Sequence, residues 1–180
     1  MKYNRAVIVD LECTCWPEAN HPPGEQTEII EIGVCLYEKQ SGLSKKQSIF
    51  VRPEYSRISE FCTQLTGHTW DSIRSKAVPF KDAVRTLEKN YPLKTSPWLS
   101  WGDFDRIQFE KDCVAKDIPY PFGRTHINLK AIFALFKQRS KGMSVSNALK
   151  DLGLEFEGRP HNGSDDAWNI GRILQKLIIS

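Results

Sequence analysis

The sequence lacks an apolar run long enough to cross a membrane. A membrane-spanning helix needs about 20 mostly apolar residues, and the first apolar run, Ala6–Val9, ends after four at Asp10. A strong excess of one charge is also missing, since 25 Lys and Arg face 22 Asp and Glu, for a net charge of +3. A charge this small does not by itself indicate nucleic-acid binding, so such binding must come from a local site.

The cysteines do not form a recognisable framework. There are five, an odd number for a chain of 180 residues, which argues against a set of structural disulfides and favours a reducing compartment. Cys13 and Cys15 form a C-x-C pair, but the other three cysteines have no spacing typical of a zinc site. We therefore expect a cytoplasmic protein without a membrane segment.

The composition is that of a globular protein. It is 40% hydrophobic and 26% charged, and a chain of this size can bury about 70% of its surface on folding. The sequence has no internal repeat and no boundary that would suggest a second domain. We expect one domain over residues 1–180.

Hydrophobic periodicity predicts an α/β fold. Strands are expected at 5–12, 28–38, 44–51 and 97–101, and helices near 59–64, after 69, and at 80–91, 105–116, 129–136, 145–152 and from about 164 onward. The second and third strands should form an antiparallel hairpin around the turn at 39–42. This order predicts a mixed central sheet, an antiparallel hairpin plus parallel strands, flanked by helices on both faces.

Acidic residues follow the first strand. Asp10 and Glu12 are two positions apart, so their carboxylates project from the same face of the strand. Two acids that end an apolar strand are costly to bury unless a cation or hydrogen bonds compensate. They are either a shared cation site or the solvated end of the strand.

The last helix carries two further acids in its first turn. Asp166 lies in phase with Ile170, Ile173 and Leu177, which predicts that it faces inward. The opposite, solvated face is expected to hold Asp165, Asn169, Arg172 and Lys176. His161 lies five residues before Asp166, on the loop that leads into this helix.

The same phase argument applies to W-G-D-F-D at 101–105. Asp105 shares a helical face with Phe109 and Cys113, whereas Asp103 precedes the helix. Asp105 is therefore the predicted inward acid, with a simple helix-capping role as its alternative.

The sequence resembles the DEDDh family of 3′-to-5′ exonucleases, in the RNase T and DnaQ-like superfamily. Three motifs carry the resemblance: V-D-L-E-C-T at 9–14, F-D at 104–105, and H-x(4)-D from His161 to Asp166. The segments at 28–33, 61–67 and 158–166 are most similar to the ERI-like branch, which includes histone-mRNA end exonucleases. The competing Asp103 is a departure within the second motif.

The resemblance implies an RNase H-like fold and a metal-dependent hydrolase. Its catalytic residues would be Asp10, Glu12, Asp105, His161 and Asp166. The four carboxylates are oxygen ligands suited to two Mg²⁺ or Mn²⁺ ions, which clamp the attacking water and the leaving oxygen. Histidine titrates near neutral pH, so His161 is expected to be the general base.

Substrate contacts are less specific. Candidates for binding the terminal nucleotide are Leu11 and Thr14, and candidates for stacking on bases are Phe61, Trp101 and Phe104. The expected partner is RNA with a single-stranded or overhanging 3′ end. Two alternatives remain: DNA as the substrate, or a non-catalytic nucleic-acid-binding module, against which the complete set of acids and His161 argues.

Overall fold

The computed structural model describes residues 4–17 and 22–179. Its elements are β1 (Arg5–Cys13), β2 (Ile29–Glu38), β3 (Gly42–Phe50), α1 (Glu60–Thr66), α2 (Trp70–Ile73), α3 (Phe80–Asn90), β4 (Trp98–Ser100), α4 (Phe104–Ala115), β5 (His126–Asn128), α5 (Leu129–Phe136), α6 (Val145–Asp151) and α7 (Gly163–Ile179). None of the described helices is long and apolar enough to cross a membrane.

The strands form one mixed sheet in the order β3-β2-β1-β4-β5. β1 pairs antiparallel with β2 and parallel with β4, and β2 pairs antiparallel with β3. The first apolar run of the chain is thus a central strand, covered on both faces. This confirms the predicted fold class, including the hairpin and the parallel strands.

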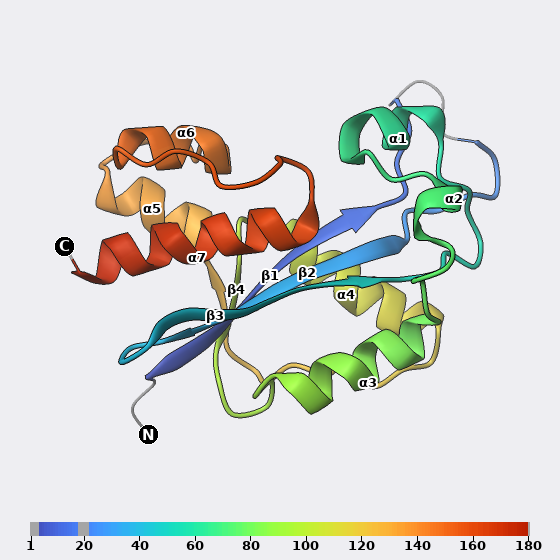
Figure 1. Ribbon diagram of the computed structural model, residues 1–180, viewed down its shortest axis with the longest axis horizontal. Coiled ribbons are helices and arrows are strands. Elements are labelled where there is room, and N and C mark those ends of the chain that lie inside the picture. Colours follow the sequence, from blue (N-terminus) through green and yellow to red (C-terminus); the bar gives the residue numbers. More distant parts are fainter. Residues whose placement is uncertain (1–3, 18–21, 180) are drawn as a thin grey trace.

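Helices cover both faces of this sheet (Figure 1). α5, α6 and α7 lie on one face and α3 and α4 on the other, while α1 and α2 lie beyond the end of β1. Alternate residues of β1 enter two separate cores: Val7 and Val9 pack on the α3 side, and Ala6 and Ile8 on the α7 side. Because Asp10 and Glu12 continue the second series, their side chains face α7.

Most predicted elements are present within a few residues of their expected bounds. The sequence did not predict β5, because its three residues, His126–Asn128, are too few to show an alternation of apolar and polar side chains. Ile178 is exposed at the end of α7. Residues 18–21, between β1 and β2, lie outside the described part of the chain.

β2 and α7 touch through their backbones at Gly33 and Gly163. A Cβ atom on Gly33 would lie 1.8 Å from the carbonyl carbon of Gly163, so no larger residue fits there. The Gly163 N–H donates to the Glu31 carboxylate at 3.1 Å. The first turn of α7 is therefore fixed directly over β2.

β3 is one edge of the sheet. Its pairing with β2 is irregular between Val34 and Leu36, and opposite this point Lys45 has a positive φ of 53°. Lys45 and Lys46 are both exposed. The edge is thus irregular and positively charged.

A buried ion pair joins the start of β2 to the end of α4. Lys116 Nζ lies 2.9 Å from Glu28, and both side chains are almost completely buried. The Glu28 carboxylate also accepts hydrogen bonds from the backbone N–H groups of Glu54 and Tyr55. It therefore connects three segments that are distant in sequence.

We expect Lys116→Ala to lower the free energy of unfolding by about 3–5 kcal/mol, because it leaves the Glu28 carboxylate buried without its counter-charge. Lys116→Met, which keeps the aliphatic stem, should be destabilised to a similar extent. Arg85→Ala is the control: Arg85 pairs with Asp82 at 3.1 Å on the surface, and its loss should cost at most about 1 kcal/mol. Urea denaturation measures all three, and equal effects of Lys116→Met and Arg85→Ala would contradict the prediction.

Candidate active site

Three carboxylates meet where β1 ends beneath the first turn of α7. The ligand atoms of Asp10, Glu12 and Asp166 all lie within 4.8 Å of one another. Figure 1 shows why: the N-terminal end of α7 lies beside the end of the β1 arrow. The structure thus brings together side chains that lie more than 150 residues apart in the sequence.

Asp105 lies beside this group but outside its tightest part. It belongs to the first turn of α4 and is buried, and its Oδ1 accepts a hydrogen bond of 3.0 Å from the Leu11 N–H. Leu11 lies between Asp10 and Glu12 on β1, so this bond fixes Asp105 next to both. The Ser100 hydroxyl, at the end of β4, lowers the pKa of Asp105 against the dominant effect of burial.

Asp103 is held away from the cluster. It precedes α4, is half exposed, and accepts a hydrogen bond of 2.7 Å from Asn128 at the end of β5. Helical phase therefore distinguishes the two acids of W-G-D-F-D as the sequence predicted.

The clustered acids resist ionising together. Burial, followed by the charges of Asp105 and Asp166, raises the pKa of Asp10. Burial raises the pKa of Glu12 to about 8, with the charge of Asp166 adding to it, and burial raises the pKa values of Asp105 and Asp166 to about 6. Such a group of oxygen donors suits a hard divalent cation, whose charge would relieve the repulsion.

His161 lies on the loop before α7, next to Asp166. Its backbone N–H donates to Asp166 Oδ2 at 2.7 Å, and its φ of 60° is in the left-handed region. The side chain is exposed. The strained backbone is held by the same carboxylate that joins the acidic group.

Glu31 was not singled out by the sequence, yet it belongs to the site. It pairs with Glu12 across β1 and β2 and is completely buried. Burial raises its pKa, but hydrogen bonds from His68 and Ser48 outweigh this effect and lower the pKa of Glu31 below its ordinary value. The available signal was the pattern E-I-I-E-I-G, which places an acid inside a buried strand.

His68 lies on the loop between α1 and α2, yet its side chain is not at the surface. It is buried, and its Nε2 lies 2.6 Å from the Glu31 carboxylate. The edge of the Phe50 ring contacts its imidazole. The buried acid requires such a partner, which only the tertiary structure reveals.

The side chains of two predicted nucleotide contacts are buried within the protein. Thr14 is fully buried, and its hydroxyl donates to Gln26 O and accepts from Glu28 N at 2.9 Å. The Leu11 side chain packs in the core on the α3 side. Both positions hold β1 in place, and their side chains are not presented to solvent.

The three aromatic candidates differ in exposure. Phe61 and Phe104 are 41% and 55% exposed and remain suited to stack on a base. Trp101 is half-buried against Phe133, and its indole N–H donates to Met143 O at 2.7 Å. Packing therefore accounts for Trp101 better than stacking does.

Asn169 was predicted to lie on the solvated face of α7, and this prediction was wrong. Asn169 is completely buried, and its side-chain amide bonds to both the N–H and the carbonyl of Glu157. Asp165 is half-buried, with a carboxylate that pairs with Lys46. Both side chains fasten the segment before His161 to α7.

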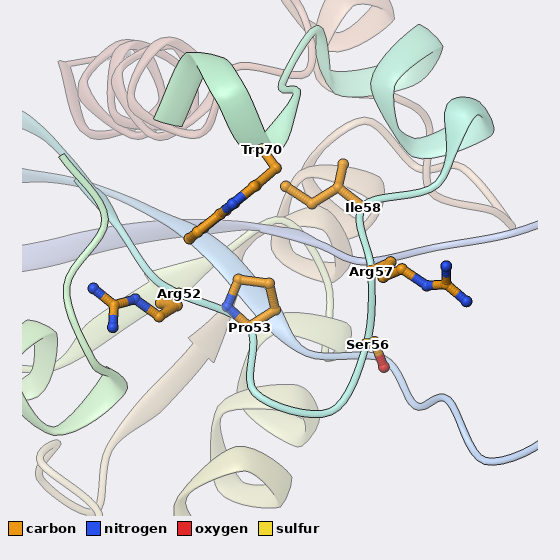
Figure 2. A pocket seen from close by; sticks show the side chains of 6 residues that line it. All are labelled: Arg52, Pro53, Ser56, Arg57, Ile58 and Trp70. Atoms are coloured by element: carbon orange, nitrogen blue, oxygen red, sulfur yellow. The ribbon is translucent and has the colours of Figure 1, made fainter. Parts of the chain in front are cut away.

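A separate hollow of about 380 Å³ lies between the loop after β3 and α2. In Figure 2 the indole of Trp70 lies between Arg52 and Ile58, above Pro53, while Arg57 extends away from it. None of the predicted site residues lines this hollow. This hollow and the acidic cluster are thus different places.

Comparison with known proteins agrees with the geometry. The family model for exonucleases of the RNase T type matches residues 7–174. The 3′-5′ exonuclease Snipper of Drosophila melanogaster is 31% identical, over 98% of this chain and 70% of Snipper. The ERI1 exoribonuclease 2 of Mus musculus is 30% identical over 98% of this chain, but the chain spans only 29% of that relative.

A solved structure gives the same picture. The nuclease domain of 3′hExo, described as a DEDDh family member bound to rAMP, superposes with a TM-score of 0.84 and 30% identity, over 98% of this chain and 92% of that domain. The described sheet and helices match this nuclease along their whole length. The chain belongs to the RNase T exonuclease family, in its DEDDh group and its ERI-like branch.

Proposed function

We propose that this chain is a 3′-to-5′ exoribonuclease that hydrolyses the phosphodiester bond at the 3′ end of RNA, and that residues 1–180 work as one exonuclease domain. The observation that carries the proposal is the meeting of Asp10, Glu12 and Asp166 within 4.8 Å, with Asp105 fixed beside them. The ribonucleotide bound to the 3′hExo nuclease domain supports RNA as the substrate.

Asp10, Glu12, Asp105 and Asp166 would hold two divalent ions, Mg²⁺ or Mn²⁺. These carboxylates fit such ions because they are hard oxygen donors gathered in a partly buried site where their own charges repel. When bound, the ions supply positive charge to the reacting phosphate and lower the pKa of water. The chain's contribution is to hold the ligands rigidly from β1, α4 and α7.

His161 is the proposed general base. The hydrogen bond from its N–H to Asp166 ties the base-carrying loop to a metal ligand, and the exposed side chain can exchange its proton with solvent. A histidine suits this role because its neutral form is present near pH 7. A binding module would need no such base, which disfavours the non-catalytic alternative.

Phe61 and Phe104 are the side chains proposed to stack on bases, since both are exposed. They come from α1 and α4, the helices that carry or adjoin the acidic end of the sheet. Stacking tolerates any base and contributes about 1–3 kcal/mol per base. The 2′-hydroxyl would then distinguish RNA from DNA.

We expect the protein to shorten a 5′-labelled single-stranded RNA from its 3′ end in Mg²⁺ or Mn²⁺, and to cleave a matched DNA more slowly. A site that reads the terminal ribose gains a hydrogen bond with RNA that DNA does not offer. Denaturing gels of both substrates in parallel, with EDTA as the blank, give the rates. Equal or faster cleavage of DNA would reject RNA as the substrate, and no cleavage of either would reject the exonuclease.

His161→Ala serves as the catalytic control in that assay. Loss of proton transfer should lower kcat by about 10²–10⁴-fold while calorimetry finds metal affinity unchanged. A variant that binds fewer ions would show that His161 is a metal ligand instead of the base.

Asp105→Asn and Asp103→Asn form a matched pair for the second motif. Asp105→Asn removes a buried metal-site charge, so we expect activity to fall by about 10²-fold or more. Asp103→Asn alters a half-exposed residue and should change activity by less than about fivefold. The opposite ranking in steady-state kinetics would show that the metal ligand is misassigned.

Stability should depend on pH in the metal-free protein. The pKa of Glu12 is about 8 and those of Asp105 and Asp166 about 6, above the ordinary values of 4.5 and 3.8. The folded state then binds more protons than the unfolded state, so the free energy of unfolding falls as pH rises from about 4 to 8.

We therefore expect the Tm of EDTA-treated protein to be higher at pH 5 than at pH 8. Mn²⁺ should raise Tm more at pH 8, where fewer protons compete with the ion for the carboxylates. Asp166→Asn should weaken both effects. A Tm that responds neither to pH nor to Mn²⁺ would contradict a metal site at these residues.

A further inference from the structure

Arg159 lies at the rim of the acidic cluster, two residues before His161. Its guanidinium is packed against Gly67, the residue that ends α1: a Cβ on Gly67 would lie 1.9 Å from Nη1 and 2.4 Å from Cζ. Gly67 has a φ of 75°. The side chain of Arg159 thus reaches from the loop before α7 to the end of α1.

The backbone of Arg159 is fixed in this position. Its N–H donates to Asp165 Oδ2 at 2.8 Å. The preceding Gly158 has a φ of 89°, and a Cβ there would lie 2.4 Å from the Asp165 carboxylate. The first turn of α7 therefore anchors Arg159 together with the proposed base.

The charge of Arg159 acts on the site from its rim. The positive charge lowers the pKa of Glu12, against the dominant effect of burial. The residue is exposed, and among residues 4–17 and 22–179 its guanidinium has no ion-pair partner within 4.0 Å. Its side-chain donors remain available for an anion.

We propose that Arg159 binds a non-bridging oxygen of the RNA phosphate immediately 5′ to the scissile one. This inference rests on the proposed function. The scissile phosphate must lie against the half-buried group of Asp10, Glu12 and Asp166, whereas the guanidinium lies outside that group, on the exposed rim. The chain that leaves the site in the 5′ direction must pass such a rim.

The chemistry of the side chain fits a phosphate. Guanidinium presents a planar fork of N–H donors that matches two phosphate oxygens, and hydrogen bonds to charged groups are the stronger ones. The net charge of the chain is only +3, so RNA binding depends on cations placed locally rather than on the overall charge. One well-placed arginine then contributes a large share of the electrostatic attraction.

The test measures kcat and KM of Arg159→Ala on single-stranded RNA, with Arg85→Ala on α3 as the matched control. We expect KM to rise about 10- to 100-fold with kcat nearly unchanged, and the dependence of log(kcat/KM) on log[salt] to become shallower by about one. Arg159→Lys keeps the charge and should recover part of the loss. Arg85→Ala should behave as the parent.

A methylphosphonate at the linkage 5′ to the scissile bond identifies the partner. This modification removes the phosphate charge, so it should raise KM for the parent and have no further effect on Arg159→Ala. The inference would be overturned if the methylphosphonate still raised KM for Arg159→Ala, or if Arg159→Ala had the KM of the parent on unmodified RNA. In either case, cleavage of RNA by the parent would leave the proposed function intact. Failure of the parent to cleave RNA would instead reject the proposed function.

Gly67→Ala gives an independent variant, because the added Cβ would occupy the position of the Arg159 guanidinium. Its KM should rise in the same direction, and the double variant with Arg159→Ala should be no worse than Arg159→Ala alone. Alanine is strained at this left-handed backbone position, so circular dichroism must show that Gly67→Ala is folded, and the assay is run well below its Tm. Additive effects on KM would show that Gly67 and Arg159 act independently, contrary to the inference.

Discussion

The contact between the backbones of Gly33 and Gly163 determines the geometry of the rest of the site. Any side chain at Gly33 would overlap the carbonyl of Gly163, so α7 would have to move away from β2. Asp166 is carried by that helix, and its partners Asp10 and Glu12 by the neighbouring strand. Metal coordination by oxygen tolerates only a few tenths of an ångström, so a small displacement of α7 would separate the ligands. The contact between these two glycines thus determines the spacing of the three carboxylates.

The acidic end of the sheet is held together against its own repulsion. Apolar residues fill both cores beneath it, and hydrogen bonds from Leu11, His161 and Gly163 fix the individual carboxylates. Burial of acids is unfavourable by itself, and the fold tolerates it where the cores provide enough stability elsewhere. A functional site that gathers like charges often lowers the stability of the whole protein. The remote ion pair of Glu28 and Lys116 joins the start of β2 to the end of α4 within the same framework.

Local periodicity accounts for what could be predicted from the sequence. The two-residue repeat placed Asp10 and Glu12 on one face, and helical phase separated Asp105 from Asp103 and turned Asp166 inward. The parts that were missed depend on partners from distant segments. The burial of Glu31 requires hydrogen bonds from His68 and from the N-terminus of α7. The Thr14 hydroxyl is hydrogen-bonded to the segment at 26–28. Asn169 is buried because the loop that contains Glu157 folds over it. No repeat within the sequence carries this information.

The character of β3 has a consequence for the behaviour of the protein in solution. An exposed sheet edge offers free backbone donors and acceptors to the edge of another molecule, and proteins commonly prevent such pairing with lysines and bulges. Lys45 and Lys46 are exposed at the point where the ladder to β2 is irregular, and the opposite edge, β5, is only three residues long. Both margins of the sheet therefore carry features that disfavour pairing with the strand of another molecule.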